Sequence, residues 1–260
     1  MNDKKKSTEE FERLLEIIDK LRTSCPWDKK QTNESLRKLT IEETYELSEA
    51  IFSGDDEGIR NELGDLMLHI VFYARIGSEK GKFSMAEVLK GINEKLIYRH
   101  PHVFSDKKVS CASEVEQNWE QLKIVENKGY KPVLSGVPAS LPAIIKANRI
   151  QEKVRGVGFD WEEREQIWDK VMEELSELKE EIRNRNTRQI ESELGDLLFS
   201  IINASRLYGI DPEAALEKTN RKFIKRFNYL ENETLRKGMS LHDMKLDAMN
   251  VIWEEAKKED

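Results

Sequence analysis

Apolar residues recur every three or four positions along most of this chain, which is the spacing that places them on one face of an amphipathic α-helix. The pattern predicts helices over residues 8–22, 34–52, 57–77, 84–98 and 113–126, and a second series over 143–154, 163–185, 187–208, 212–230 and 240–258. The sequence contains no convincing alternation of apolar and polar residues of the kind that a half-buried β-strand requires. The pattern therefore predicts an all-α fold.

The composition changes in the middle of the chain, where glycine and proline crowd into residues 128–142. Such a segment is typical of a linker between domains. Because the order of predicted helices begins again after it, we predict two tandem repeats. The N-terminal repeat spans residues 1–127, the linker 128–142 and the C-terminal repeat 143–260.

Two pairs of acidic residues lie on consecutive predicted helices of the second half. Glu174 and Glu177 are three positions apart, and so are Glu193 and Asp196. Residues three apart on a helix lie on one face, about one turn from each other. If the helices pack as an antiparallel hairpin, with a bend near residues 184–187 and Thr187 as the N-cap, all four carboxylates point into one groove.

Four carboxylates at close range repel one another unless a cation lies between them. Because every ligand atom is an oxygen, the cation expected here is Mg²⁺, for which Mn²⁺ is an alternative. A competing interpretation is a solvated acidic helix face that needs no ion. Lys170 precedes Glu174 by four positions and shares its helix face, where it can meet a phosphate held at the same site.

The first half of the chain repeats the acidic pattern. Its members lie 131 positions before their counterparts and are Glu43, Glu46, Glu62 and Asp65. Gly64 and Gly195 share this offset, as do Arg75 and Arg206. A merely solvated acidic face has no reason to keep such a register, so the repetition favours a shared task. Because a glycine within a helix costs about 1 kcal/mol relative to alanine, we expect the two glycines to mark close contacts between helices.

The two repeats differ beside the acidic residues. The counterpart of Lys170 is Leu39, so the first repeat keeps its carboxylates but lacks a matched cation. We therefore predict that the C-terminal repeat carries most of the catalysis. His69 lies four positions after Asp65 and has Ser200 as its counterpart, and we interpret it as a partly buried histidine whose hydrogen bonds are satisfied.

Basic residues follow each acidic hairpin along the chain. Lys222 and Arg226 are four positions apart, as are Lys95 and Arg99, so each pair occupies one helix face. A divalent metal held by carboxylates, with basic side chains nearby, is the apparatus that proteins use to handle phosphates. The alternative is a basic surface stripe that pairs with acids. Trp253 either stacks on a base or belongs to the core.

Overall composition limits the partners of the chain. With 260 residues, 36% of them charged, and a net charge of −7, it lacks the large basic surface that duplex nucleic acid requires. No apolar run approaches membrane-spanning length, and the first six residues lead into charge rather than into a signal peptide. Cys25 and Cys111 form neither a metal-binding spacing nor a disulfide framework. We expect a cytoplasmic protein without membrane or duplex nucleic acid partners.

Both repeats contain the sequence EExxE followed by ExxD, at residues 42–46 with 62–65 and at 173–177 with 193–196. With these motifs the chain resembles the MazG family of nucleoside triphosphate pyrophosphohydrolases. The sequences CPWD, QT and RHPHVF in the first half resemble the first repeat of the long, two-domain members. Asn33 departs from the histidine that commonly follows the QT pair, which puts any role of that position in doubt.

The resemblance implies two tandem all-α NTP pyrophosphatase bundles, Mg²⁺ dependence and a homodimer. It also implies hydrolysis of NTPs and dNTPs to nucleoside monophosphate and pyrophosphate, either to clear abnormal nucleotides or to control a signalling nucleotide. The catalytic metal ligands would be Glu174, Glu177, Glu193 and Asp196. The residues near the nucleotide would be Lys170, Lys222, Arg226 and Trp253.

Three other functions remain open at this point. A binding or scaffold module of two helical repeats accounts for the duplication but not for carboxylates in strict register. A di-iron bundle also carries glutamate pairs on facing helices, but it normally needs Glu-x-x-His, which neither repeat has. A phosphate-releasing triphosphatase would cut the terminal phosphate bond instead.

Overall fold

The computed structural model describes residues 2–105 and 132–259. Every regular element in these two ranges is helical and no strand occurs in them, so the prediction of an all-α fold is confirmed. The chain divides into two compact units, Met1–Val109 and Ser110–Asp260, which we describe separately. The helix predicted over 113–126 and the start of the predicted linker lie outside the described residues. The boundaries predicted for the repeats therefore stay a prediction.

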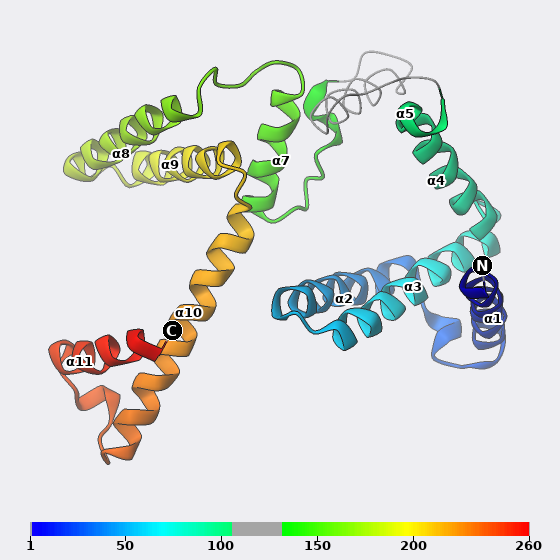
Figure 1. Cartoon of the computed structure of the whole chain (residues 1–260), viewed down its shortest axis with the longest axis horizontal. Helices are drawn as coiled ribbons and strands as arrows, with labels where there is room; N and C mark the ends of the chain where they lie inside the picture. The colour runs from blue at the N-terminus through cyan, green and yellow to red at the C-terminus, as the bar shows by residue number, and fades with distance from the viewer. Residues whose placement is uncertain (1, 106–131, 260) are drawn as a thin grey trace. The chain divides into compact units, whose positions relative to one another are not determined.

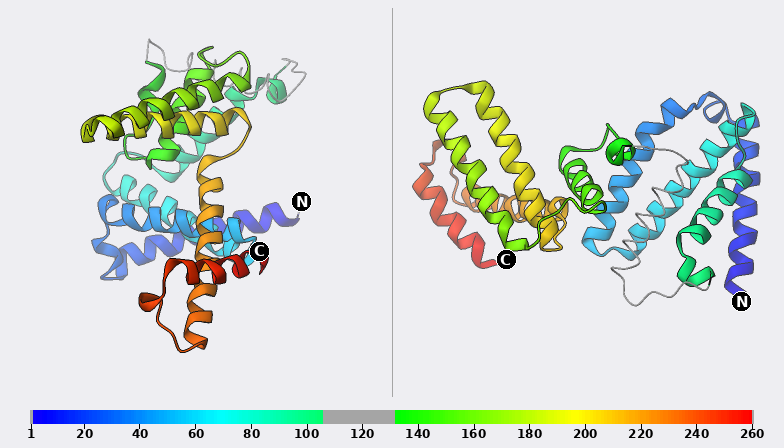
Figure 2. Two further views of the ribbon diagram at one scale, coloured as in Figure 1. Left: turned by 90° about the vertical axis from the view of Figure 1, so that its left-hand side faces the viewer. Right: turned by 90° about the horizontal axis from the view of Figure 1, so that it is seen from above.

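The first unit is built on a helical hairpin. Its helices are α1 (Asn2–Ser24), α2 (Asn33–Ser53), α3 (Asp56–Glu79), α4 (Met85–Arg99) and the short α5 (Pro101–Phe104). Helices α2 and α3 lie antiparallel and side by side in all three views (Figures 1 and 2), and α1 packs on α3. Their contact buries a core of Ile18, Leu36, Val71, Phe72 and Ile76.

The turn of this hairpin follows from local sequence. Helix α2 ends at Ser53, and its C-cap is Gly54, whose φ of 70° lies in the left-handed region that glycine adopts without strain. Asp55 then caps α3, because its side chain accepts a hydrogen bond of 3.0 Å from the backbone N–H of Gly58. The two residues reverse the chain and set the register in which the acidic faces of α2 and α3 meet.

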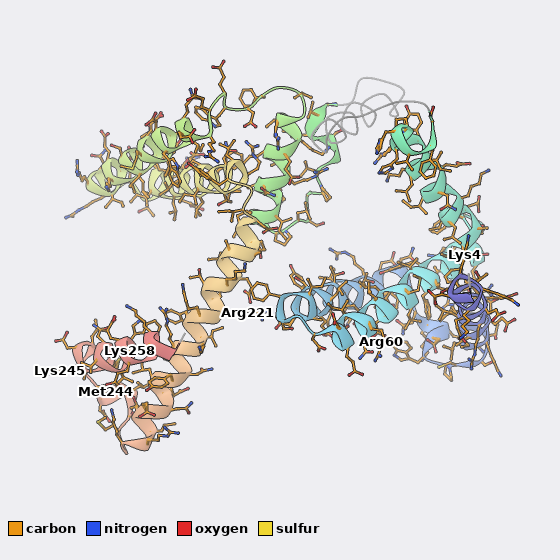
Figure 3. All side chains as sticks on the ribbon, viewed as in Figure 1. Lys4, Arg60, Arg221, Met244, Lys245 and Lys258 are labelled. Atoms are coloured by element: carbon orange, nitrogen blue, oxygen red, sulfur yellow. The ribbon has the colours of Figure 1, made fainter. Side chains whose placement is uncertain are left out.

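The second unit repeats the hairpin and extends it. Its helices are α7 (Ala143–Arg155), α8 (Ile167–Asn184), α9 (Thr187–Leu207), α10 (Pro212–Arg236) and α11 (Leu246–Ala256). Helices α8 and α9 form the antiparallel pair, and α7 packs against α9 (Figures 1 and 2). Helix α11 folds back on α10, with Met244 and Lys245 in the segment before it and Lys258 just after it (Figure 3).

The bend between α8 and α9 falls where the sequence predicted it, but its capping residue differs. Arg185 adopts a left-handed conformation with φ of 57° and ends α8. Asn186 is the N-cap of α9, since its side chain accepts a hydrogen bond from the backbone N–H of Gln189. Thr187 is the first residue of the helix, so its predicted role as N-cap is wrong. Because the left-handed Arg185 reverses the chain in fewer residues than expected, the N-cap of α9 is Asn186 instead of Thr187.

Gly64 and Gly195 do not mark close contacts between helices, which corrects the expectation from their register. Apart from the neighbouring backbone of its own helix, a Cβ atom added at either glycine would meet no heavy atom of the described residues within 4 Å. The hairpins close through other positions of their helices, and these glycines lie on open faces beside the exposed Leu63 and Leu194.

Candidate active site

The acidic residues of the second unit come together across the α8–α9 hairpin. Glu174 and Glu177 on α8 and Glu193 on α9 each offer a carboxylate oxygen, and these oxygens all lie within 4.8 Å of one another. In the first unit the corresponding group consists of Glu43, Glu62 and Asp65. Each hairpin thus brings together three of its four predicted ligands. The predicted ligand outside the group is Asp196 in the second unit and Glu46 in the first.

The fourth carboxylates are close enough to act on the others electrostatically. Burial, followed by the charges of Glu177, Asp196 and Glu174, raises the pKa of Glu193 above its ordinary value. In the first unit, burial and then the neighbouring carboxylates, Glu46 among them, raise the pKa of Glu43. Because a cation would relieve this repulsion and every donor is an oxygen, both clusters fit a hard divalent metal ion.

One further carboxylate belongs to this environment and was not predicted. The charge of Glu181 also raises the pKa of Glu193. Glu181 lies four positions after Glu177 on α8, so the helical spacing was a signal that could have identified it. Its counterpart in the first unit is Ala50, which is buried. The second cluster therefore has a neighbouring carboxylate that the first cluster lacks.

Lys170 contacts the second cluster directly. Its Nζ atom lies 2.8 Å from a carboxylate oxygen of Glu174 and 3.0 Å from one of Glu173. These hydrogen bonds raise the pKa of Lys170 above its ordinary value, so the side chain carries its positive charge throughout the neutral range. In the first unit Leu39 occupies the equivalent position and packs against the hydrophobic core.

A cavity of about 570 Å³ opens beside the second cluster. Its walls come from α7, the segment before α8, α8 and α9, and they are mainly apolar. Lys170, Glu174 and Asp196 form part of the wall, so the cavity adjoins the carboxylates. Gln151 of α7 also lines it, although a single glutamine on an amphipathic helix gave no signal in the sequence. The cavity volume lies within the range of small-molecule sites.

The arginines that share the repeat offset are structural. Arg206 on α9 pairs with Asp160, which it approaches to 3.0 Å, and donates two hydrogen bonds to Asn203. Arg75 on α3 pairs with Asp19 at 3.1 Å and with Glu79 at 3.3 Å. In each unit this arginine ties the second helix of the hairpin to the segment that precedes the hairpin.

His69 is more deeply buried than predicted and its hydrogen bonding is incomplete. The residue is 6% exposed and its Nδ1 atom has no hydrogen-bond partner in the part of the chain that the structure describes, so the interpretation of a satisfied histidine is wrong. Burial lowers its pKa, and the nearby charge of Asp65 opposes that effect only in part. His69 is not among the residues whose ligand atoms cluster with Glu43, Glu62 and Asp65.

The basic residues predicted to contact the nucleotide lie elsewhere in their units. Lys222 and Arg226 are on α10, whose packing partners are α11, α7 and α9. Trp253 on α11 is half-buried against Phe223, with 5.1 Å between the ring centroids. In the first unit Lys95 and Arg99 lie on α4, which packs on α3 and α5. Within the described part of one chain, these residues are not gathered at the carboxylate clusters.

The fold and the site define an all-α protein of two helical-hairpin repeats, each with a carboxylate cluster suited to a divalent metal ion. Residues 31–104 and 162–230, more than half of the chain, match the model of the MazG nucleotide pyrophosphohydrolase domain, and the chain belongs to this family. Both matched segments include an acidic hairpin. Among the described helices, none has the length and apolar character needed to cross a membrane.

Several characterised and uncharacterised proteins are similar along nearly the whole chain. Over 250 residues the chain is 44% identical to the nucleoside triphosphate pyrophosphohydrolase/pyrophosphatase MazG of Thermotoga maritima, covering 95% of both. Over 258 residues it is 40% identical to the nucleoside triphosphate pyrophosphohydrolase of Escherichia coli K12, covering 96% of this chain and 98% of that protein. The uncharacterized protein YabN of Bacillus subtilis is 43% identical over 253 residues, which span 52% of its length.

Proposed function

We propose that this chain is a nucleoside triphosphate pyrophosphohydrolase, which converts NTPs and dNTPs to nucleoside monophosphate and pyrophosphate. The relatives named for this activity align over nearly their full length, which supports the assignment. The main structural support for this activity is that a carboxylate cluster, a charged lysine and a cavity adjoin one another in the second unit. A triphosphate needs metal and cationic contacts, and its nucleoside needs an adjoining mainly apolar space.

The proposed metal is Mg²⁺, which Mn²⁺ can replace, and its ligands are Glu174, Glu177, Glu193 and Asp196. The all-oxygen donor set and the raised pKa of Glu193 support this choice. When bound, the ion neutralises phosphate oxygens and activates water. Glu43, Glu46, Glu62 and Asp65 form a second proposed metal site, in the repeat without the lysine.

Lys170 has the role of orienting the triphosphate. Its Nζ atom contacts Glu174 and its side chain lines the cavity, so it borders both the proposed metal site and the space for the nucleoside. A phosphate oxygen bound there accepts a charge-assisted hydrogen bond from the ammonium group. This arrangement supports catalysis mainly by the C-terminal repeat.

We further propose that the protein is a homodimer. An apolar stripe on α9, formed by Leu194, Leu198 and Ile201, is exposed on the open side of the hairpin. An equivalent stripe on α3 is formed by Leu63, Met67 and Ile70. A second copy would cover such stripes as the third and fourth helices of a bundle. It would also offer a route by which Lys222, Arg226 and Trp253 reach a nucleotide at the carboxylates.

The decisive experiment is to incubate the protein with a panel of NTPs and dNTPs plus Mg²⁺ and to separate the products by chromatography. We expect monophosphate and pyrophosphate in equal amounts. Diphosphate and orthophosphate as the main products would mean a triphosphatase that cuts the terminal bond. No turnover of any member of the panel would contradict the proposed activity altogether.

A further inference from the structure

Gln151, whose side chain lines the cavity, has a buried polar atom with no hydrogen-bond partner among the described residues. Gln151 on α7 is 3% exposed, and its Nε2 atom donates a hydrogen bond of 2.8 Å to the backbone carbonyl oxygen of Phe199. Because a carbonyl oxygen can only accept, this bond fixes which end of the amide faces Phe199. The opposite end, Oε1, is buried and makes no hydrogen bond within residues 2–105 and 132–259. Gln151 therefore holds a fixed, unused acceptor.

An unused buried acceptor destabilises a protein, so its presence needs an explanation. Gln151 lines the same cavity as Lys170 and Glu174, which mark the side where a triphosphate would lie. Trp161 and Phe159, from the segment before α8, add aromatic surface to the wall. A mainly apolar space with aromatic walls and one fixed acceptor suits the flat ring of a nucleobase that carries an N–H group.

We infer that Gln151 is a specificity-determining residue whose Oε1 atom accepts a hydrogen bond from an N–H group of the substrate base in this cavity, an inference that rests on the proposed function. On the edge that pairs in duplexes, adenine and cytosine present an exocyclic amino group, uracil presents a ring N–H, and guanine presents both. A base without a donor on that edge leaves Oε1 unpaired and is discriminated against.

The first unit provides an internal comparison. At the repeat offset, Ser200 and Asn203 of the cavity wall correspond to His69 and Phe72, both of which are buried. Phe72 packs with Ile18 of α1 in the hydrophobic core, and Leu39 packs against the same core. At these positions the first unit has the larger side chains of His69 and Phe72, both buried, where the second unit has residues of the cavity wall. The base site is therefore assigned to the second unit.

The test compares a preferred NTP with an analogue that differs at the N–H group. The NTP with the highest kcat/KM decides which pair is compared. The pairs are ATP with purine riboside triphosphate, CTP with its analogue lacking the 4-amino group, UTP with its N3-methyl analogue, and GTP with N1-methylinosine triphosphate, which has neither the ring N–H nor the amino group. We expect the unmodified enzyme to favour the natural substrate about tenfold or more, as one buried hydrogen bond implies. In Gln151→Leu, kcat/KM for the natural substrate should fall to the level of the analogue.

Turnover of the analogue is the internal control, because Gln151→Leu should leave it nearly unchanged. If the leucine variant does not fold, Gln151→Met keeps the length of the side chain and replaces it. An unchanged preference in a folded variant, or an equal loss for both substrates, would overturn the role of Gln151. Calorimetric binding of the corresponding monophosphate without metal should show the same preference. Failure of the unmodified protein to hydrolyse any NTP would instead contradict the proposed function.

Discussion

The ammonium group of Lys170 lies 2.8 Å from a carboxylate oxygen of Glu174, one helical turn further along α8. Glu174 belongs to the carboxylate cluster, and Lys170 also lines the cavity, so this pair joins the two parts of the candidate site. In the first unit the pair is replaced by Leu39 and Glu43. The two repeats thus share the acidic residues but differ in the cation beside them.

Removing the charge of Lys170 should impair turnover. We expect Lys170→Met to lower kcat/KM for the preferred NTP by about 10- to 100-fold, because a cation aimed at the reacting phosphates stabilises charge in the transition state. Lys170→Arg should recover part of the loss. Lys179→Met, at an exposed position of the same helix, is the matched control and should leave the rate unchanged. Equal rates for Lys170→Met and Lys179→Met would show that Lys170 does not contact the substrate.

The carboxylates of the two repeats should contribute unequally. Glu174→Gln combined with Glu177→Gln should reduce kcat by at least about 100-fold, since it removes charge from the proposed metal site. Glu43→Gln combined with Glu46→Gln should leave most of the activity. Steady-state rates are compared after circular dichroism has established that both variants are folded. The reverse order of rates would place the working site in the first unit.

Activity should depend on a metal ion that prefers oxygen ligands. We expect EDTA to abolish turnover and Mg²⁺ or Mn²⁺ to restore it, because the ligand atoms of both clusters are carboxylate oxygens. Calorimetric titration with Mn²⁺ provides a measurement independent of turnover. Glu193→Gln should weaken the tighter of the observed binding events. Full activity in excess chelator would exclude the site as proposed.

The sequence predicted the hairpins well because both their apolar residues and their acidic residues recur at helical spacing. The apolar stripes fixed the helices, and the three-residue spacing of Glu174 with Glu177 placed both carboxylates on one face of α8. The common offset of the repeats predicted the same arrangement in the first unit, where Glu43 and Glu62 do lie together. Such features depend on neighbours within one or two helical turns, and these are the relationships that a pattern of residues records.

The features that were missed depend on contacts between elements. Gln151 contributes to the cavity only because α7 packs on α9 and brings its amide to the carbonyl of Phe199, and no spacing encodes that contact. The segment before α8, which supplies Trp161 to the wall, has no helical period. Gly195 was misread because a glycine in a repeated motif does not reveal whether another helix packs against it.

Without metal, Glu193 should destabilise the folded protein at neutral pH. Its pKa is raised in the folded state by burial and neighbouring carboxylates, so the folded state holds its proton more tightly than the unfolded state. Stability therefore falls as the pH rises through the interval between the ordinary and the raised pKa. Glu193→Gln should raise the Tm of the metal-free protein at pH 7, and the gain should vanish below about pH 4. Glu191→Gln, exposed on the same helix, should show no such change.

The protein should be a dimer or a larger oligomer in solution. The chain has a mass of 30.4 kDa, and light scattering at micromolar concentration should give at least twice this value. Leu198→Glu places a charge in the exposed stripe of α9. Because Leu198 is 53% exposed in the single chain, the unit should fold with this charge, but the charge should prevent a second copy from covering the stripe. Met67→Glu is the equivalent change on α3, where Met67 is 40% exposed, and comparing the two variants identifies the hairpin that associates. The protein could instead be a monomer at micromolar concentration, with Leu198→Glu and Met67→Glu both as active as the unmodified protein. That result would mean that the stripes are not interfaces and that the site is complete within one chain.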